Sequence, residues 1–500
     1  MKTTIHSLVT AALALPALTG ATKCKPLVTP ERLQKHISLD NLLAGSQKLQ
    51  DLANAHGGNR AFGSGGHNAT VDYLYDTLSA LNYYTVTKQP FTEVFSQGSA
   101  TLSVNGGEIK ADTMTYTPGG SYSGSVVKVD NLGCTAADFP AAVTGKVALV
   151  SRGECSFALK STNAKTAGAA GAIIYNNVDG TISGTLGAPF GSYAPTVGIT
   201  QAEGLKIVAA LEAGEVTVDL DIDAIVESRV NYNVIAETKG GDHDNVLVLG
   251  GHSDSVAAGP GINDDGSGTI GVLNVAVALS KFKVKNTIRF GFWGAEEFGK
   301  LGSYFYVKSL NGSEAEVAKM RAYLNFDMIA SPNYVYGVYD GDGSAFNLSG
   351  PAGSDVIEKD FEEFFITNGE ASVPSEFSGR SDYAAFIENG IPSGGLFTGA
   401  EVLKTEAEAA LFGGEAGVAY DINYHKIGDD ITNLNHEAYL LNTMAIANSV
   451  AKYAISFDSL PPVNPLHRRW SADRAQLLQR SLSHHEHGHS GPCGSGGDAI

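Results

Sequence analysis

Residues 245–268, NVLVLGGHSDSVAAGPGINDDGSG, decide how the chain is interpreted. The stretch begins as an apolar run typical of a buried β-strand. His252, Asp254, Asp264 and Asp265 then follow among small and flexible residues. Carboxylates held side by side repel one another, and burying them is costly unless positive charge lies between them. The stretch is therefore either a polar surface loop or a metal site, and the rest of the chain must decide.

Strand-like and helix-like segments alternate from residue 225 to about residue 456. Apolar strand candidates lie at 245–252, 287–294, 323–328 and 390–397, and amphipathic helix candidates lie at 268–282 and 437–455. Such alternation is typical of a mostly parallel sheet with helices on both faces. We therefore predict an α/β fold with a mostly parallel central sheet.

The chain divides into segments of different character. Residues 111–224 consist of short β-branched runs and Gly-rich turns, which predicts a small self-contained α/β insert. Residues 22–110 and 225–460 are then the two parts of the main domain. Residues 461–500 form a low-complexity tail, and we interpret its run HHEHGH as a solvated extension rather than a metal site.

The first 21 residues indicate export. They contain Lys2, an apolar run and small residues up to Ala21, which is typical of a secretory signal peptide and too short for a membrane span. No later stretch approaches the ~20 consecutive apolar residues of a membrane-spanning helix. The formal net charge of -19 argues against nucleic acid or an anionic membrane as a partner. We expect a secreted, extracellular protein, with the vacuole as the alternative.

The cysteines fit an oxidising compartment. Four are present, at Cys24, Cys134, Cys155 and Cys493, and they allow three pairings. Cys134 and Cys155 are close in sequence and form the expected disulfide, while a bond between Cys24 and Cys493 stays open. Sequons for N-glycosylation occur at Asn68, Asn311 and Asn347.

Acidic residues follow several of the predicted strands. Glu296 and Glu297 come after the strand 287–294, and Asp327 ends the next one. Ligands of open α/β sheets bind at the carboxyl ends of the strands, so these groups should meet His252 at one edge. Acidic residues are common in loops, which explains any one of them; three strands that each end in a carboxylate or histidine favour a metal site. Two metal ions bridged by one Asp would neutralise such a cluster.

Histidine is scarce in the main domain. Between residues 225 and 460 the chain has four, at His243, His252, His425 and His436. His243 precedes its strand and His436 opens the last helix, so we interpret both as surface residues. His252 and His425 remain the candidate imidazole ligands.

The ordered motifs resemble a known family. HSDS (252–255), GINDDGSG (261–268), GAEEFGKLGS (294–303), NFDM (325–328) and YH (424–425) resemble the aminopeptidase Y type of co-catalytic dizinc aminopeptidases, which includes secreted and vacuolar fungal leucine aminopeptidases. The insert, with LGCTAADFP (132–140) and the run 145–176, resembles a protease-associated domain. The resemblance covers roughly residues 40–456 and implies a zinc-exopeptidase fold interrupted by that domain.

The resemblance also implies the metal ligands. It implies His252, Asp264 and Asp327 around one zinc ion. Around the second zinc ion it implies Asp264, Glu297 and His425, with Asp264 as the bridge. All of these positions carry a suitable ligand type, so nothing in the sequence indicates a degenerate, non-catalytic relative.

Other residues receive roles from the same resemblance. Glu296 is implied as the general base, Asp254 as the group that orients His252, and Tyr424 as the stabiliser of the oxyanion. Arg380 is a candidate for holding substrate, with a loop-bracing salt bridge as the alternative. Asp265 is interpreted as a turn residue.

The implied function is zinc-dependent removal of the N-terminal residue, leucine or another apolar residue, from peptides with a free N-terminus. Three alternatives stay open: a carboxypeptidase, a glutaminyl-cyclase-like acyltransferase with one zinc ion, and a peptidase-like binding protein without catalysis. The insert offers no catalytic group, and either substrate restriction or sorting and stability would explain it. The sequence does not give the oligomeric state, and we favour a monomer.

Overall fold

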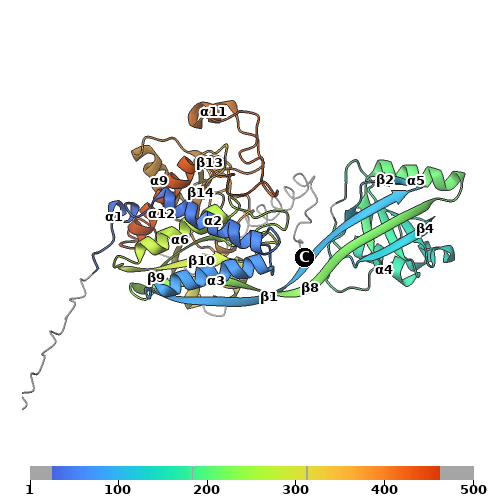
Figure 1. The fold of residues 1–500 in the computed structure, drawn as a ribbon, viewed down its shortest axis with the longest axis horizontal. Coiled ribbons are helices and arrows are strands. Elements are labelled where there is room, and N and C mark those ends of the chain that lie inside the picture. Colours follow the sequence, from blue (N-terminus) through green and yellow to red (C-terminus); the bar gives the residue numbers. More distant parts are fainter. Residues whose placement is uncertain (1–24, 183, 311–313, 462–500) are drawn as a thin grey trace, which may run out of the picture.

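The computed structural model describes residues 25–182, 184–310 and 314–461 (Figure 1). The predicted signal peptide, Cys24, Asn311, Cys493 and nearly all of the predicted tail lie outside these residues. Figure 1 shows a large and a small lobe joined by two long strands. Among the described residues, no helix is both long and apolar enough to cross a membrane.

The large lobe contains a sheet whose centre is parallel. Its strand order is β13 (Val373–Ser375), β12 (Gly337–Tyr339), β14 (Ser393–Phe397), β11 (Met320–Phe326), β9 (Asp242–His252), β10 (Asn286–Trp293) and β8 (Thr217–Thr238). The four central strands, β14, β11, β9 and β10, are parallel to one another. At the two sides of this group, β12 pairs antiparallel with β14, and β8 pairs antiparallel with β10. The predicted mostly parallel α/β sheet is confirmed.

Both faces of this sheet are covered by helices because its central strands are apolar on both sides. Leu247 and Leu249 of β9 point into one core, and the alternating Val246 and Val248 point into the other. The first core is covered by α2 (Leu39–Ala55), α3 (Gly65–Ala80), α6 (Gly266–Leu279), α9 (Ser354–Thr367) and α12 (His436–Tyr453). The second is covered by α7 (Leu301–Leu310), α8 (Glu314–Ala318) and α10 (Tyr383–Ile387). Two short helices complete the lobe: α1 (Pro30–Gln34) contributes the buried Leu33 to the first core, and α11 (Glu406–Phe412) has no buried residue.

The small lobe is an α/β unit with its own core. Four strands are parallel: β4 (Gly120–Lys128), β5 (Val147–Ser151), β6 (Gly171–Tyr175) and β7 (Thr196–Ile199). β3 (Asp112–Thr113) pairs antiparallel with β7, and β2 (Gly107–Ile109) pairs antiparallel with β1 (Tyr84–Val104). Helices α4 (Phe157–Thr166) and α5 (Gln201–Ala213) pack on this sheet, and two short 3-10 turns lie at Ala136–Asp138 and Ala141–Val143. Leu102, which precedes the expected boundary at residue 111, is part of the core of this lobe.

Two strands connect the lobes. β1 (Tyr84–Val104) and β8 pair antiparallel without interruption, from Tyr84 opposite Thr238 to Val104 opposite Val218. Each strand therefore begins or ends in one lobe and runs through into the other (Figure 1). Residues 97–99, midway along this ribbon, are exposed on β1.

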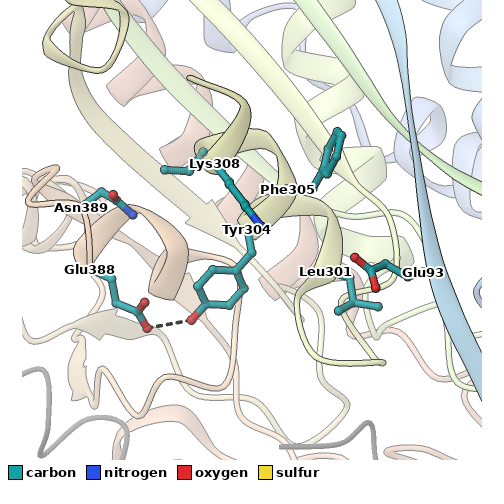
Figure 2. Close-up of a pocket in the computed structure, with 8 residues that line it drawn as sticks. Glu93, Leu301, Tyr304, Phe305, Lys308, Glu388 and Asn389 are labelled. Atoms are coloured by element: carbon teal, nitrogen blue, oxygen red, sulfur yellow. Dashed lines mark hydrogen bonds between the residues drawn. The ribbon is translucent and has the colours of Figure 1, made fainter. Parts of the chain in front are cut away.

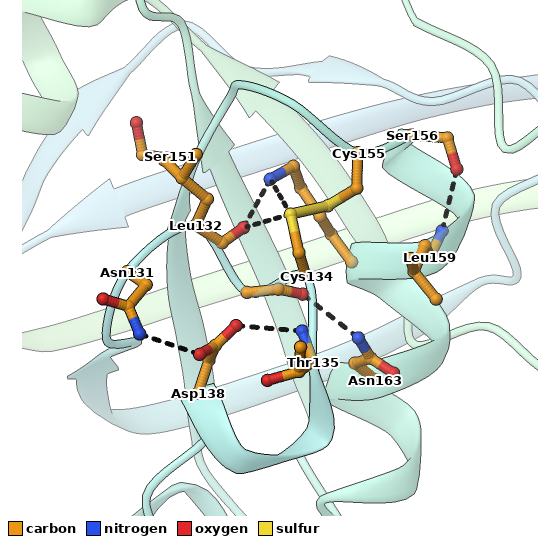
Figure 3. The surroundings of a disulfide bond; sticks show 12 residues. Asn131, Leu132, Cys134, Thr135, Asp138, Ser151, Cys155, Ser156, Leu159 and Asn163 are labelled. Atoms are coloured by element: carbon orange, nitrogen blue, oxygen red, sulfur yellow. Dashed lines mark hydrogen bonds between the residues drawn. A yellow bond between two sulfur atoms is a disulfide. The ribbon is translucent and has the colours of Figure 1, made fainter.

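The expected disulfide is present in the small lobe. Figure 3 shows Cys134 bonded to Cys155, with the two Cα atoms 5.8 Å apart. Nearby, Asn163 of α4 donates to the carbonyl of Gly133 at 3.1 Å, and Lys160 donates to the carbonyl of Leu132. The loop that carries Cys134 is thereby fastened to α4.

Two of the predicted glycosylation sites lie within the described residues. Asn68 is exposed in the first turns of α3, and Asn347 is exposed in the loop that precedes α9. Both side chains are accessible to an attached glycan, and their use stays a prediction.

Candidate metal centre

The carboxyl ends of three parallel strands meet at one edge of the large sheet. His252 is the last residue of β9, Glu296 and Glu297 follow β10, and Asp327 follows β11. The strand order β11-β9-β10 places these ends side by side. The structure thus brings together the groups that the sequence places at strand ends.

Asp264 lies between two histidines. Its Oδ1 is 3.2 Å from Nε2 of His252, and its Oδ2 is 3.3 Å from Nε2 of His425. Asp327 Oδ1 lies 3.6 Å from Nε2 of His252, and Glu297 Oε2 lies 2.9 Å from Nε2 of His425. The residues therefore form two groups that share Asp264, one on each of its oxygens.

Asp265 has a different role from its neighbour. Its Oδ1 accepts the N–H groups of Gly268 and Met328, and its Oδ2 accepts the N–H of His252. It caps α6 and fixes the backbone of β9 against the segment after β11. Because both oxygens are engaged by the backbone, Asp265 is a scaffold residue, although its carboxylate is close enough to His252 and Asp327 to fit a metal group.

The donor set fits metal ions such as zinc, which take imidazole nitrogen and carboxylate oxygen. His252, Asp264 and Glu297 offer ligand atoms that lie within 4.8 Å of one another. Both ring nitrogens of His252 and Oε1 of Glu297 are buried and have no hydrogen-bond partner among the described residues. Buried polar atoms are normally satisfied, and a bound metal ion would satisfy these atoms.

Burial and neighbouring charges oppose each other at these ligands. Burial disfavours the charged form of Asp264, yet His252 and His425 hold the pKa of its carboxyl below the usual value. Burial likewise disfavours imidazolium at His252, yet Asp327 and the other nearby carboxylates raise its pKa well above the ordinary range. The cluster attracts positive charge strongly enough to outweigh desolvation.

Glu296 and Asp254 lie beside these groups. Asp254 Oδ1 accepts the backbone N–H of Glu296 at 3.1 Å and lies 3.6 Å from Nδ1 of His252. Burial, followed by the charges of Asp382 and Asp327, raises the pKa of the Glu296 carboxyl well above its usual value, although His252 opposes the shift. A carboxylate with a raised pKa is suited to accept and return a proton near neutral pH.

Arg380 and Tyr424 are in contact on the His425 side. Arg380 donates from Nη2 to the Tyr424 hydroxyl at 3.1 Å and from Nη1 to Glu401 at 2.8 Å. The ring of Tyr424 stacks on that of His425, with centroids 3.8 Å apart. The ion pair with Glu401 corresponds to the loop-bracing alternative expected for Arg380, and it also directs the guanidinium to the tyrosine hydroxyl.

Comparison with known proteins identifies the family. Residues 233–450 match the model of Peptidase family M28, and residues 122–207 match that of the PA domain. A probable leucine aminopeptidase 2 of Aspergillus fumigatus is 53% identical over 480 residues, which cover 95% of each chain. The chain belongs to peptidase family M28.

Further relatives agree with this assignment. Leucine aminopeptidase 2 of Arthroderma otae is 52% identical and covers 91% of this chain and 92% of its own. An aminopeptidase structure from Aneurinibacillus sp. has a TM-score of 0.61 at 28% identity and covers 87% of this chain and 97% of its own. BSAP, a zinc aminopeptidase of Bacillus subtilis, has a TM-score of 0.57 at 26% identity, with 84% and 95% covered. The predicted fold and the enzyme class, a metallo-aminopeptidase, are confirmed.

Several residues at the centre of this M28 chain have unusual backbone conformations. Ala295 before Glu296, Met328 after Asp327, and His425 itself have φ values of 60°, 53° and 56°. Non-glycine residues rarely adopt this left-handed region, and such conformations persist where the surroundings enforce them. All three positions belong to, or directly adjoin, the candidate ligands and base at this edge.

Four residues at the centre were not predicted from the sequence. The Arg60 guanidinium donates to the carbonyls of Ser253, Pro260 and Gly261. Ser381 donates from its hydroxyl to Asp327 at 2.5 Å. The carboxylate of Asp429 accepts the backbone N–H groups of Asn263 and Asp264. Asp382 is fully buried, and burial raises the pKa of its carboxyl to about 7. Ser381 and Asp382 lie in GRSDYAAF, where the sequence suggests a role for Arg380 alone, and the sequence around Arg60 or Asp429 carries no comparable signal.

A separate hollow lies on the outside of the large lobe (Figure 2). It is lined by residues of α7 with Glu93, Glu388 and Asn389, and Tyr304 donates to Glu388 at 2.7 Å. None of the predicted site residues lines it. The hollow therefore contributes nothing to the metal centre.

Proposed function

We propose that this M28 protein is a secreted aminopeptidase that uses two zinc ions and removes leucine or other apolar N-terminal residues from peptides. One observation carries the proposal: the two oxygens of Asp264 face two different histidines. A single carboxylate arranged in this way is suited to bridge two metal ions. The resemblance to a B. subtilis protein described as a zinc aminopeptidase supports the choice of metal.

The ligands divide between the two ions. His252, Asp264 and Asp327 would hold one, and Asp264, Glu297 and His425 would hold the other. When bound, two zinc ions supply Lewis-acid polarisation of a water molecule and of the scissile carbonyl. In a cyclase-like enzyme with a single zinc ion, Glu297 and His425 would have no metal ion to bind.

Glu296 acts as the general base. Its carboxylate takes a proton from the attacking water and later returns it to the leaving amine. The desolvation that raises its pKa makes it a better proton acceptor than an exposed glutamate. Asp254 positions the base, because it holds the Glu296 backbone and lies next to the His252 ring.

Tyr424 stabilises the oxyanion that develops on the carbonyl oxygen. Its hydroxyl is held by Arg380, which keeps the donor in a fixed place and leaves the tyrosine proton available. A preoriented donor in a buried site stabilises developing charge without reorganisation during the reaction. Arg380 is thus a positioning residue, fixed in turn by Glu401.

The acidic surroundings explain a preference for a free N-terminus. Glu296, Asp327 and Asp382 are mutually close enough to affect one another's charge. An α-ammonium group is attracted to such a cluster, whereas the negative carboxylate that a carboxypeptidase must bind is repelled. The leucine preference is proposed from the names of relatives with more than 50% identity, and secretion from the signal-like first 21 residues.

Hydrolysis of leucine p-nitroanilide by the purified protein tests the proposal. Activity should disappear after chelation and return when zinc is added back, with two zinc ions bound per chain at full activity. N-acetyl-leucine p-nitroanilide is the matched control and should resist cleavage because it has no ammonium group. Rapid turnover of the acetylated substrate, or full activity with one zinc ion, would contradict the proposal. Activity in the medium of a secreting host, rather than within the cells, tests export.

A further inference from the structure

A second group of carboxylates lies away from the metal centre. Asp340 and Asp342 follow β12, and Glu358 lies on α9. The three residues offer oxygen atoms that lie within 4.8 Å of one another. Because β12 runs antiparallel to β14, its last residue lies toward the amino ends of the parallel strands, whereas His252 lies at their carboxyl ends. The group is therefore separate from the catalytic residues.

Asp340 has one oxygen in use and one without a partner. Its Oδ2 accepts the N–H groups of Ala345 and Phe346 at 3.1 and 2.9 Å, which closes the loop after β12. The side chain is buried, with the residue 1% exposed, and its Oδ1 accepts no hydrogen bond from any residue that the structure describes. A buried carboxylate oxygen without a hydrogen-bond donor lowers the stability of the fold unless a cation binds it.

Glu358 adds a second buried charge. Its Oε2 accepts the N–H groups of Gly341 and Asp342, both at 3.0 Å. Burial raises the pKa of its carboxyl to about 7, and the charges of Asp342 and Asp340 add to the shift. Within the described ranges no Lys or Arg makes an ion pair with this group, since Lys359 pairs with Asp355 instead. Hydrogen bonds from Ser344 and the charge of Lys359 lower the pKa of the exposed Asp342 carboxyl, so the chain offsets the negative charge of this group only in part.

The chemistry of the group selects a hard cation. All of its donors are oxygen atoms, which suits Ca²⁺ and Mg²⁺ rather than zinc. Asp340, Asp342 and Ser344 occupy alternate positions of the loop DGDGS, and calcium loops commonly take ligands from alternate positions. Asp342 is exposed, so water can complete the six to eight oxygen ligands that Ca²⁺ accepts, whereas Mg²⁺ demands stricter geometry.

We propose that Asp340, Asp342 and Glu358 form a calcium site that fastens the loop 340–346 to α9. This site stabilises the side of the large sheet formed by β12 and β13 and takes no part in the reaction. It does not depend on the proposed aminopeptidase activity, because none of its residues lies at the catalytic edge.

Calorimetric titration of the zinc-loaded protein with Ca²⁺ tests the site. We expect one saturable binding event per chain and a melting temperature that rises by several degrees at saturation. The affinity for Mg²⁺ should be at least about tenfold lower than the affinity for Ca²⁺. Absence of saturable Ca²⁺ binding, or Mg²⁺ binding of equal strength, would overturn the assignment.

Two variants locate the binding. Asp342→Asn removes an exposed carboxylate, so the fold should survive while Ca²⁺ affinity falls about tenfold or more. Asp340→Asn should abolish the thermal shift. Glu363→Gln is the matched control, because Glu363 lies on the same helix but is exposed and outside the group, and it should bind Ca²⁺ like the wild type. Wild-type Ca²⁺ affinity in Asp342→Asn would show that the ion binds elsewhere.

Discussion

At the scale of single residues, the most informative contact is the one between Asp254 and the Glu296 backbone. Asp254 is fully buried and lies within 3.6 Å of the His252 ring. One carboxylate thereby holds the backbone of the base and lies beside a ligand that ends a different strand. The separation between the base and the ligands is thus influenced by a side chain that is itself neither the base nor an assigned metal ligand.

Replacement of the base should separate catalysis from metal binding. Glu296→Gln keeps the shape of the side chain and the backbone hydrogen bond to Asp254, but it cannot accept the proton of the attacking water. We expect the zinc content to be unchanged and kcat for leucine p-nitroanilide to fall by about 10²–10⁴-fold. Metal analysis and steady-state kinetics on the same preparation measure both quantities.

Asp264→Asn is the matched control for that variant. Because Asp264 faces both histidines, its loss should lower the zinc content as well as the rate. An Asp264 variant with two zinc ions bound would remove that residue from the bridge. A Glu296 variant within tenfold of the wild-type rate would show that another group accepts the proton.

The sequence predicted these residues unequally. His252, Glu296, Glu297 and Asp327 could be placed at one edge because they follow apolar strands, and parallel strands end together. The distinction between Asp264 and Asp265 depended on the resemblance, because adjacent identical side chains leave no periodic signal. Only the hydrogen bonds of the backbone show which carboxylate is already engaged.

At the scale of elements, the loop between β9 and α6 depends on a residue far away in sequence. Arg60 is fully buried and donates to the carbonyls of Ser253, Pro260 and Gly261, while its own N–H donates to Ser255. Burial lowers the pKa of its guanidinium, and Asp254 and Asp429 oppose that shift. The loop that carries Asp254 and Asp264 is therefore closed around one cation.

Removal of this cation should loosen the loop. Arg60→Met leaves buried carbonyls without a donor and nearby carboxylates without a counter-charge, so we expect a loss of roughly 3–5 kcal/mol in the free energy of unfolding. Denaturant unfolding of the zinc-loaded protein measures this loss. Arg32→Met, at an exposed position on α1, is the control and should change stability by less than about 0.5 kcal/mol. Equal effects of the two substitutions would contradict the role assigned to Arg60.

The strands and helices were largely predictable from the sequence, whereas the long-range hydrogen bonds that hold the loops between them were not. The apolar runs at 245–252 and 287–294 correspond to β9 and β10, because strands buried on both faces need continuous hydrophobic sequence. Arg60 gave no signal, since a single basic residue before a helix is usually exposed. Long-range partners of this kind become visible only when the chain is folded.

At the scale of the whole molecule, the two lobes are built as separate cores on one ribbon. The small lobe has its own buried clusters on both faces of its sheet, and β1 and β8 cross between the lobes with exposed residues midway. The sequence indicated the change of composition near residue 111. It did not indicate that strands of the main domain continue into the insert, because a long strand with alternating exposure is locally like two short ones.

Because each lobe has its own core, the disulfide should stabilise only the small one. Replacing Cys134 and Cys155 together by Ser frees a loop of sequence separation 21, which should cost about 3 kcal/mol for that lobe. In differential scanning calorimetry one transition should move to lower temperature while the other stays in place. The kcat for leucine p-nitroanilide should be unchanged at 25 °C, because the bond lies in the lobe that contributes none of the metal ligands. A single transition that shifts as a whole would show instead that the ribbon couples the lobes into one cooperative unit.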